Sequence, residues 1–265
     1  MSRLLAVPLA LVAPLALAPL AGAGSSSPVK TVEITAAAAA PWIVAGSSVG
    51  ITGSVRPRAT GLGLSLQERV SGGWTTVATK TVGGSTFSFL AKPKDAGMAT
   101  FRVIAVKGGP FAGNSAPVPV KVLRWSFLSD QYTRPVAGDL LTDPNSAHGV
   151  MYDHVISMDA GCYNAWNGDA WADYILNRQY EQFTATVALD DAAPPNSTAT
   201  WSIWGGGEVL AHGSLANGTE QQVKVPVAGV YRLRLKINVP DPTGAAGCSE
   251  TFTQVVFGNP QLLGP

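Results

Sequence analysis

The strongest constraint on the fold of this chain is the alternation of apolar and polar residues along short segments. Within the expected strand 230–238, every second side chain of residues 231–237 is apolar, and basic side chains fill the positions between them. This period of two predicts a half-buried β-strand. The apolar set is Tyr231, Leu233, Leu235 and Ile237, and the basic set is Arg232, Arg234 and Lys236. Since no amphipathic helix longer than about two turns is visible, the sequence predicts an all-β protein.

The charge of the chain argues against a nucleic-acid partner. Charged residues make up 13% of the sequence and the formal net charge is +1. A nucleic-acid binder needs a basic patch or stripe to neutralise phosphates, and the sequence has none.

The first 23 residues have the pattern of a secretory signal peptide. Arg3 precedes an apolar run from Leu4 to Leu20, and Ala21 and Ala23 offer a small-residue cleavage site. A membrane anchor is the alternative, but prolines interrupt the run, which is short of the roughly 20 residues that span a bilayer. We therefore expect a secreted, extracellular product with a flexible lead-in at 24–30 and no membrane span in the mature form.

Residues 31–123 predict an immunoglobulin-like sandwich. Seven short strands follow one another at the spacing of such a fold, and Gly72-Gly73 and Gly83-Gly84 suit tight hairpins. Segments such as 49–55, 64–69 and 96–103 resemble the Ig-like repeats of exported actinobacterial proteins. We expect a spacer domain, with Trp74 as a strand residue beside its turn rather than a ligand platform. The expected strands are 31–35, 49–55, 62–70, 74–82, 86–90, 100–106 and 118–122.

Residues 124–265 predict a second domain, which follows the first without a linker. The order of its strands suggests a jelly-roll sandwich. We expect strands at 153–158, 171–176, 182–189, 200–204, 208–212, 221–225, 230–238 and 252–257.

The second domain also resembles a known family. The segments that carry the likeness are 125–130, 152–160, 174–180, 183–191, 200–203, 229–235 and 255–262. Together they look like the NPCBM family, whose name stands for novel putative carbohydrate-binding module. This resemblance implies a galactose-binding-like β-sandwich that binds galactose-type sugars through loops at one end. Such modules are usually appended to glycoside hydrolases, so a glycoside hydrolase is an implied partner.

Two segments depart from the family pattern. Ser157-Met-Asp-Ala160 stands where many members have Gly-Thr-His-Ala, so Asp159 replaces the usual histidine. Residues 247–252 replace an Asp-His-Ala-Asp-Trp run. The only two cysteines, Cys162 and Cys248, lie beside and within these segments, and in an exported chain such a pair predicts a disulfide. If the family fold brings the two loops together, the disulfide would clamp them; a metal site or a catalytic thiol is the alternative.

The loop at 163–171 carries the residue types that bind sugars. Aromatic rings stack on the C–H faces of a sugar, and carboxylates and amides fix its hydroxyls. For Trp166 the alternative is a cover for the disulfide, and Trp171 is expected to pack inward as core. Trp201 is also expected in the core, whereas Trp204 has the opposite parity. The predicted ligand-binding residues are Asp159, Tyr163, Asn164, Trp166, Asn167, Asp169 and Trp204.

Asp190 and Asp191 form the acidic end of a predicted strand. Adjacent strand residues project to opposite faces, which is unsuited to the paired carboxylates of a glycosidase. A structural calcium ion is one reading, because this cation takes loop carboxylates, and a solvated turn is the other. No cofactor is otherwise required.

Three functions remain open at this point. The first is a non-catalytic protein that recognises galactose-type, cell-wall or plant glycans. The second is a structural or adhesive surface protein whose module no longer binds sugar. The third is a hydrolase built on Asp159, Asp169 and Asp190. We favour the first, since the chain has no nucleophile elbow and no zinc-protease motif.

Overall fold

The structure is a computed structural model that describes residues 28–106, 109–131, 133–159, 169–240 and 253–265, without the side chains of 133–136. Within these residues the secondary structure consists of strands and one 3-10 turn, η1, at Leu128–Asp130. The all-β prediction is therefore confirmed. The described part of the chain contains no helix with the length and apolar character needed to cross a membrane.

The N-terminal half is a sandwich of two layers whose strands pair antiparallel except for β3, which pairs parallel with β10. A three-stranded sheet faces the first part of a larger, ten-stranded sheet. The three-stranded sheet has the order β2 (Glu33–Ala38), β4 (Val49–Arg56) and β7 (Thr86–Ala91). The facing layer contains β6 (Gly73–Val82), β5 (Leu62–Val70), β8 (Gly97–Ala105), β10 (Val118–Phe127) and β3 (Trp42–Val44). A parallel pair, β1 (Lys30–Thr31) and β9 (Phe111–Ala112), lies outside these layers.

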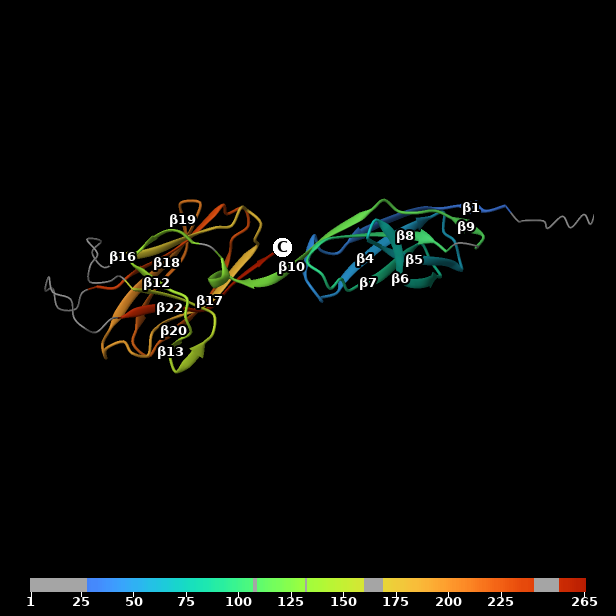
Figure 1. The fold of residues 1–265 in the computed structure, drawn as a ribbon. Coiled ribbons are helices and arrows are strands. Elements are labelled where there is room, and N and C mark those ends of the chain that lie inside the picture. The colour runs from blue at the N-terminus through green and yellow to red at the C-terminus, as the bar shows by residue number, and fades with distance from the viewer. Residues whose placement is uncertain (1–27, 107–108, 132, 160–168, 241–252) are drawn as a thin grey trace, which may run out of the picture.

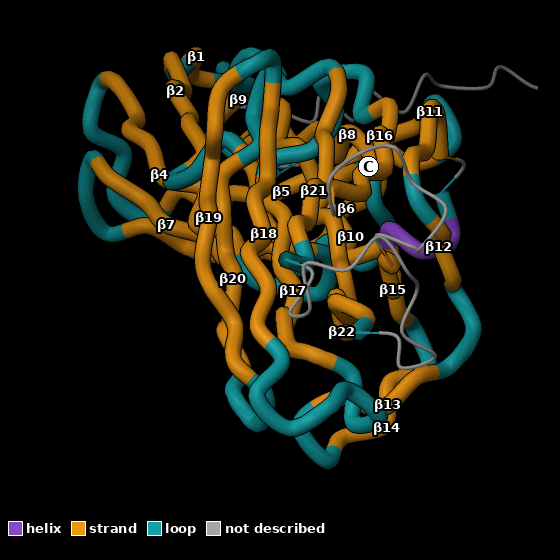
Figure 2. The backbone as a smooth tube through the Cα atoms, turned by 90° about the vertical axis from the view of Figure 1, so that its left-hand side faces the viewer, coloured by secondary structure: helices purple, strands orange, loops and turns teal. Residues whose placement is uncertain are grey.

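The C-terminal half is a second sandwich. One layer continues the ten-stranded sheet through β12 (Asp139–Leu141), β15 (Val155–Asp159), β22 (Gln254–Gly264), β17 (Gln182–Leu189) and β20 (Glu220–Pro226). The other layer has the order β11 (Thr133–Ala137), β16 (Asp169–Ile175), β21 (Arg232–Asn238), β18 (Thr198–Gly205) and β19 (Glu208–Ala216). Figure 2 shows β19, β18, β21 and β16 following one another across the molecule. A hairpin of β13 (Asn145–Ala147) and β14 (Val150–Tyr152) adds a small separate sheet.

Strand β10 joins the two sandwiches. Its first half pairs with β8 through residues 118–122, and its second half pairs with β22 through residues 124–127. An ion pair between Lys121 Nζ and Glu181 Oε1, 2.8 Å apart, lies at this junction. The two sandwiches therefore lie end to end, with the C-terminus at the junction and β12 and β16 toward the opposite end of the second sandwich (Figure 1). The boundary expected at residues 123 and 124 falls inside β10, and no linker interrupts the strand.

Each sandwich has its own buried apolar core. In the first, the expected inward residues of β5 and β8 are fully buried, as Leu64, Leu66, Phe101 and Val103 show. In the second, Leu233, Leu235 and Ile237 are buried as predicted. The prediction for Tyr231 was wrong: this residue precedes β21 and its side chain is 53% exposed.

Candidate functional site

The strand ends that flank the predicted sugar-binding loops meet at one end of the second sandwich, which we call the loop end. In one sheet β15 ends at Asp159, in register with Gln254 at the start of β22. In the other sheet β16 begins at Asp169, in register with Asn238 at the end of β21. The loop end lies away from the first sandwich (Figure 1).

Gly138 shows how closely the two sheets approach at the loop end. Its backbone has φ +82°, and a Cβ atom added there would lie 2.5 Å from both the carbonyl oxygen of Asp159 and the Cβ of Ala170. Both distances are too short for a real Cβ, so a glycine is required. The structure thus brings together Asp159 and the start of β16, two parts of the predicted site from different sheets.

Asp169 is held in place by two neighbours on β21. Its Oδ2 lies 2.8 Å from Lys236 Nζ, and its Oδ1 accepts a hydrogen bond of 3.0 Å from Asn238 Nδ2. The carboxylate is about one third exposed. An acceptor fixed in this way can receive a hydrogen bond from a ligand hydroxyl without first losing side-chain freedom.

Asp190 joins a polar network around Gln254. Its Oδ1 accepts the backbone N–H of Gln254 at 2.9 Å, and its own N–H donates to the Gln254 carbonyl at 3.1 Å. The Gln254 side chain accepts from Asn145 Nδ2 at 2.9 Å, and the same amide also donates to Ser157 Oγ at 3.1 Å. Through Gln254 the network connects Asp190 with the strand that ends at Asp159.

The two residues predicted to bind calcium both accept backbone N–H groups. Asp190 accepts the backbone N–H of Gln254, and Asp191 Oδ1 accepts the backbone N–H of Gly149 at 3.0 Å. Asp190 is buried and Asp191 is exposed, as expected for adjacent residues of a strand end. In the described ranges no three His, Cys, Asp or Glu side chains gather closely enough to hold a metal ion. In the described structure, these carboxylates thus anchor the β13–β14 hairpin and the start of β22.

Burial raises the pKa of the Asp190 carboxyl above its usual value, although backbone hydrogen bonds act in the opposite direction. A raised folded-state pKa means that folding favours the protonated form. Its contribution to stability is therefore present at pH values below the ordinary pKa of an aspartate and is lost as the pH rises through the folded-state pKa.

We therefore expect Asp190→Asn to change the pH dependence of stability. The amide keeps the Oδ1 acceptor for Gln254 and removes the buried charge. As the pH is raised from 3 to 7, the stability of the variant relative to that of the wild type should therefore increase. Urea unfolding across this range measures the difference. Asp191→Asn, at an exposed carboxylate that also accepts a backbone N–H, should follow the wild type; the same pH-dependent gain in both variants would contradict the prediction.

Two tryptophans lie on the outward face of the β16–β21–β18 sheet. Trp204, a predicted ligand residue, is half-buried and donates from Nε1 to Ser202 Oγ at 2.8 Å. The prediction that Trp171 packs inward was wrong: Ala170, Ala172 and Tyr174 fill the core instead. Trp171 is half-buried on the outward face, where the Arg234 guanidinium lies 5.3 Å from its ring centroid. β16 begins two residues earlier than expected, a shift that leaves the alternation unchanged, so the error lay in which face of the strand packs on the core.

The other predicted residues of this region lie outside the described residues. They are the ligand candidates Tyr163, Asn164, Trp166 and Asn167 and the cysteines Cys162 and Cys248. Their roles stay predictions.

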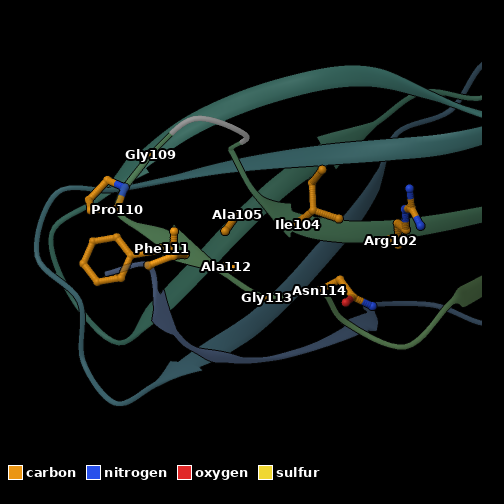
Figure 3. Close-up of a pocket in the computed structure, with 10 residues that line it drawn as sticks. Arg102, Ile104, Ala105, Gly109, Pro110, Phe111, Ala112, Gly113 and Asn114 are labelled. Atoms are coloured by element: carbon orange, nitrogen blue, oxygen red, sulfur yellow. The ribbon is translucent and has the colours of Figure 1, made fainter. Parts of the chain in front are cut away.

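A hollow with a volume of about 850 Å³ lies in the first sandwich, between β8 and β9. Figure 3 shows Phe111 and Pro110 at one end and Arg102 and Asn114 at the other. Among the described residues of the lining, Arg102 is the one charged residue. Its Nε donates to Gln67 Oε1 at 2.9 Å, and its guanidinium lies 4.2 Å from the ring centroid of Trp74. The hollow therefore offers few polar groups to fix the hydroxyls of a sugar.

Sequence reasoning missed the residues that hold the predicted carboxylates in place. Asn145 and Gln254 support Asp190, and Lys236 and Asn238 support Asp169. The period-two pattern of 230–238 already placed Lys236 and Asn238 on one face. Their alignment with Asp169 needed the register between β16 and β21, which no pattern within one strand contains. The resulting loop end combines carboxylates with amide groups, which can accept from and donate to sugar hydroxyls.

The fold and the loop end define a β-sandwich protein with a polar end, and comparison with known families makes the class more specific. Residues 146–262 match the model of the NPCBM/NEW2 domain family. The prediction of an NPCBM domain in the C-terminal half is thus confirmed, and this match supports a carbohydrate-binding role for this half. The match covers less than half of the chain. No match was found among curated protein sequences.

Two solved structures similar to this chain come from Clostridium perfringens. The CBM51-2 and INT domains of ZmpB have a TM-score of 0.42 and 13% identity, and the alignment covers 64% of this chain and 38% of that one. CBM51 of GH95, in complex with methyl-galactose, has a TM-score of 0.38 and 21% identity, and the alignment covers 52% of this chain and 99% of that one. With TM-scores below 0.5, neither likeness bears on the ligand of this protein.

Proposed function

We propose that this is a secreted, non-catalytic protein that recognises glycans of the galactose type or of cell-wall and plant polysaccharides. The observation that carries the proposal is the position of Asp159, Asp169 and Asp190 at strand ends of the loop end, in a sandwich whose sequence matches a carbohydrate-binding family. Carboxylates held by neighbouring amides and a lysine suit the orientation of hydroxyl groups.

The predicted loop residues complete this proposed site. Tyr163 and Trp166 would stack on the sugar, and Asn164 and Asn167 would bond to its hydroxyls. A disulfide between Cys162 and Cys248 would join the two loops that flank the site, and a calcium ion at Asp190 and Asp191 would stiffen it. The immunoglobulin-like first sandwich would serve as a spacer, since the end-to-end arrangement places the loop end far from it. A glycoside hydrolase acting on the same glycan is the proposed partner.

The placement of the carboxylates supports binding rather than hydrolysis. Asp169 is paired with Lys236, and Asp190 is buried and accepts a backbone N–H. A glycosidase needs one carboxyl group as an acid and a second as a base or nucleophile, both facing the scissile bond.

A glycan array tests the proposal. The exported form, residues 24–265, is screened with calcium and with chelator, together with Trp166→Ala. We expect binding to galactose-type glycans that Trp166→Ala removes and that Trp42→Ala, at an exposed tryptophan of the first sandwich, leaves unchanged. Weaker binding in chelator would support the proposed calcium ion. Absence of binding to every glycan would contradict the proposal and favour a structural or adhesive role.

A further inference from the structure

The outward face of the β16–β21–β18–β19 sheet is an ordered array of polar and aromatic side chains. Strand register arranges it in rows that cross the sheet. Nearest the loop end the row is Asp169, Asn238, Thr200 and Ser214; the next is Trp171, Lys236, Ser202 and His212; the third is Asp173, Arg234, Trp204 and Val209; and Ile175 and Arg232 begin the fourth. We call these residues the outer face. The side chains of the opposite parity fill the core.

A fully buried carboxylate fixes the centre of the outer face. Asp173 has no exposed surface, and its two oxygens accept from Arg234 Nε at 2.6 Å and Arg234 Nη2 at 2.9 Å. This two-point contact holds the guanidinium in one plane, and the bond to Asp173 raises the pKa of Arg234. Arg234 stays about one third exposed, so a guanidinium with a fixed orientation reaches the surface of the sheet.

Two aromatic rings flank this guanidinium. Trp171 on β16 lies beside it, and Trp204 is the residue of β18 that is in register with Arg234. The two tryptophans are two strands apart, which at the usual strand spacing is about 10 Å across the sheet. Trp204 is oriented by its hydrogen bond to Ser202. Half-buried rings at this spacing, with fixed donors between them, can stack on separate units of one sugar chain.

The charges of the outer face favour an acidic chain. Three cations, Arg232, Arg234 and Lys236, share the face with two carboxylates. Asp173 binds Arg234, and Asp169 binds Lys236. Arg232 makes only a 3.6 Å approach to Asp173, whose oxygens already accept from Arg234, and its side chain is 56% exposed. An exposed guanidinium without a short contact to a carboxylate in the described structure is suited to bind one on a ligand in the two-point mode.

We propose that the outer face is a second carbohydrate-binding surface, which binds a glycan chain bearing carboxylate groups. One sugar unit stacks on Trp204 while its carboxylate pairs with Arg232, and the chain continues across β21 toward Trp171. The inference rests on the proposed carbohydrate-binding role of the second sandwich but not on the loop-end site, because Trp204 and Arg232 lie on strands outside the loops.

Binding to two polymers tests the inference. Polygalacturonate is the acidic probe and galactan the neutral one, with affinity measured by calorimetry on the exported chain. We expect Arg232→Gln and Trp204→Ala each to weaken binding to polygalacturonate about tenfold. The affinity for polygalacturonate should also fall as salt is raised, because exposed charges are screened. Two control variants, Arg69→Gln and Trp42→Ala, remove an exposed arginine and an exposed tryptophan from the first sandwich. They should leave the affinity for polygalacturonate unchanged.

The outcomes separate this inference from the loop-end proposal. Wild-type affinity for polygalacturonate in a folded Arg232→Gln variant would overturn the inference, and so would failure of the wild type to bind this polymer. Trp166→Ala reports on the loop end independently. Because Arg232 is exposed, its substitution should leave the unfolding curve unchanged. Arg232→Gln therefore still tests the inference if Trp204→Ala lowers the stability of the protein.

Discussion

Replacing Trp201 with alanine should lower the free energy of unfolding of the second sandwich by about 3–5 kcal/mol. The indole is buried in the core and 5% exposed. It lies opposite Gly213 on β19, where any Cβ would collide with the ring. Its Nε1 donates to Gln221 Oε1 on β20 at 2.9 Å. The substitution therefore leaves a cavity and removes a bond that links the two sheets.

Urea unfolding followed by circular dichroism measures the effect. Trp42→Ala removes the same side chain from a site that is 40% exposed and should cost less than about 1 kcal/mol, as surface substitutions usually do. If Trp201→Ala lowers the free energy of unfolding no more than Trp42→Ala does, the core does not depend on the indole.

Asp173→Asn is expected to destabilise the second sandwich by about 2 kcal/mol. Asp173 is completely buried and takes two short hydrogen bonds from Arg234. Loss of one partner of a buried ion pair costs about 3–5 kcal/mol, and the partial exposure of Arg234 lets water offset part of this. The released guanidinium should also leave its place beside Trp171, so the fluorescence of the folded state should change.

Asp169→Asn provides the comparison for this prediction. It removes a carboxylate that is about one third exposed and paired with Lys236, a pair worth about 1 kcal/mol or less. A double-mutant cycle with Asp173→Asn and Arg234→Gln isolates the coupling energy. A coupling close to zero would mean that Asp173 acts through the packing of its side chain and not through the ion pair.

The sequence predicted the type of structure and the faces of its longest strands. The expected strands at 62–70 and 182–189 match β5 and β17 residue for residue. The core positions of β21 and Trp201 were also correct. Short strands such as β3, β11 and β12 were missed, because three to five residues are too few for alternation to be distinguished from chance. The last strand was expected at 252–257 and extends from Gln254 to Gly264.

The candidate site was predictable only in part. The family resemblance was confirmed for residues 146–262, whereas the roles of Asp159, Asp169 and Asp190 stay predictions from residue type and position. The outward orientation of Trp171 was not recognised, since it depends on which face of β16 packs on the core, and Ala170, Ala172 and Tyr174 occupy that face.

The sequence by itself determined that the chain forms two successive sandwiches of half-buried strands, because hydrophobic burial requires every second residue of such a segment to face a core. Tertiary structure decided which strands are neighbours, and therefore that Asp173 meets Arg234, that Asp169 meets Lys236, and that β10 serves both sandwiches. These contacts join residues more than 60 positions apart or depend on the register between strands. Register is set by the combined packing of whole sheets, which no single segment encodes.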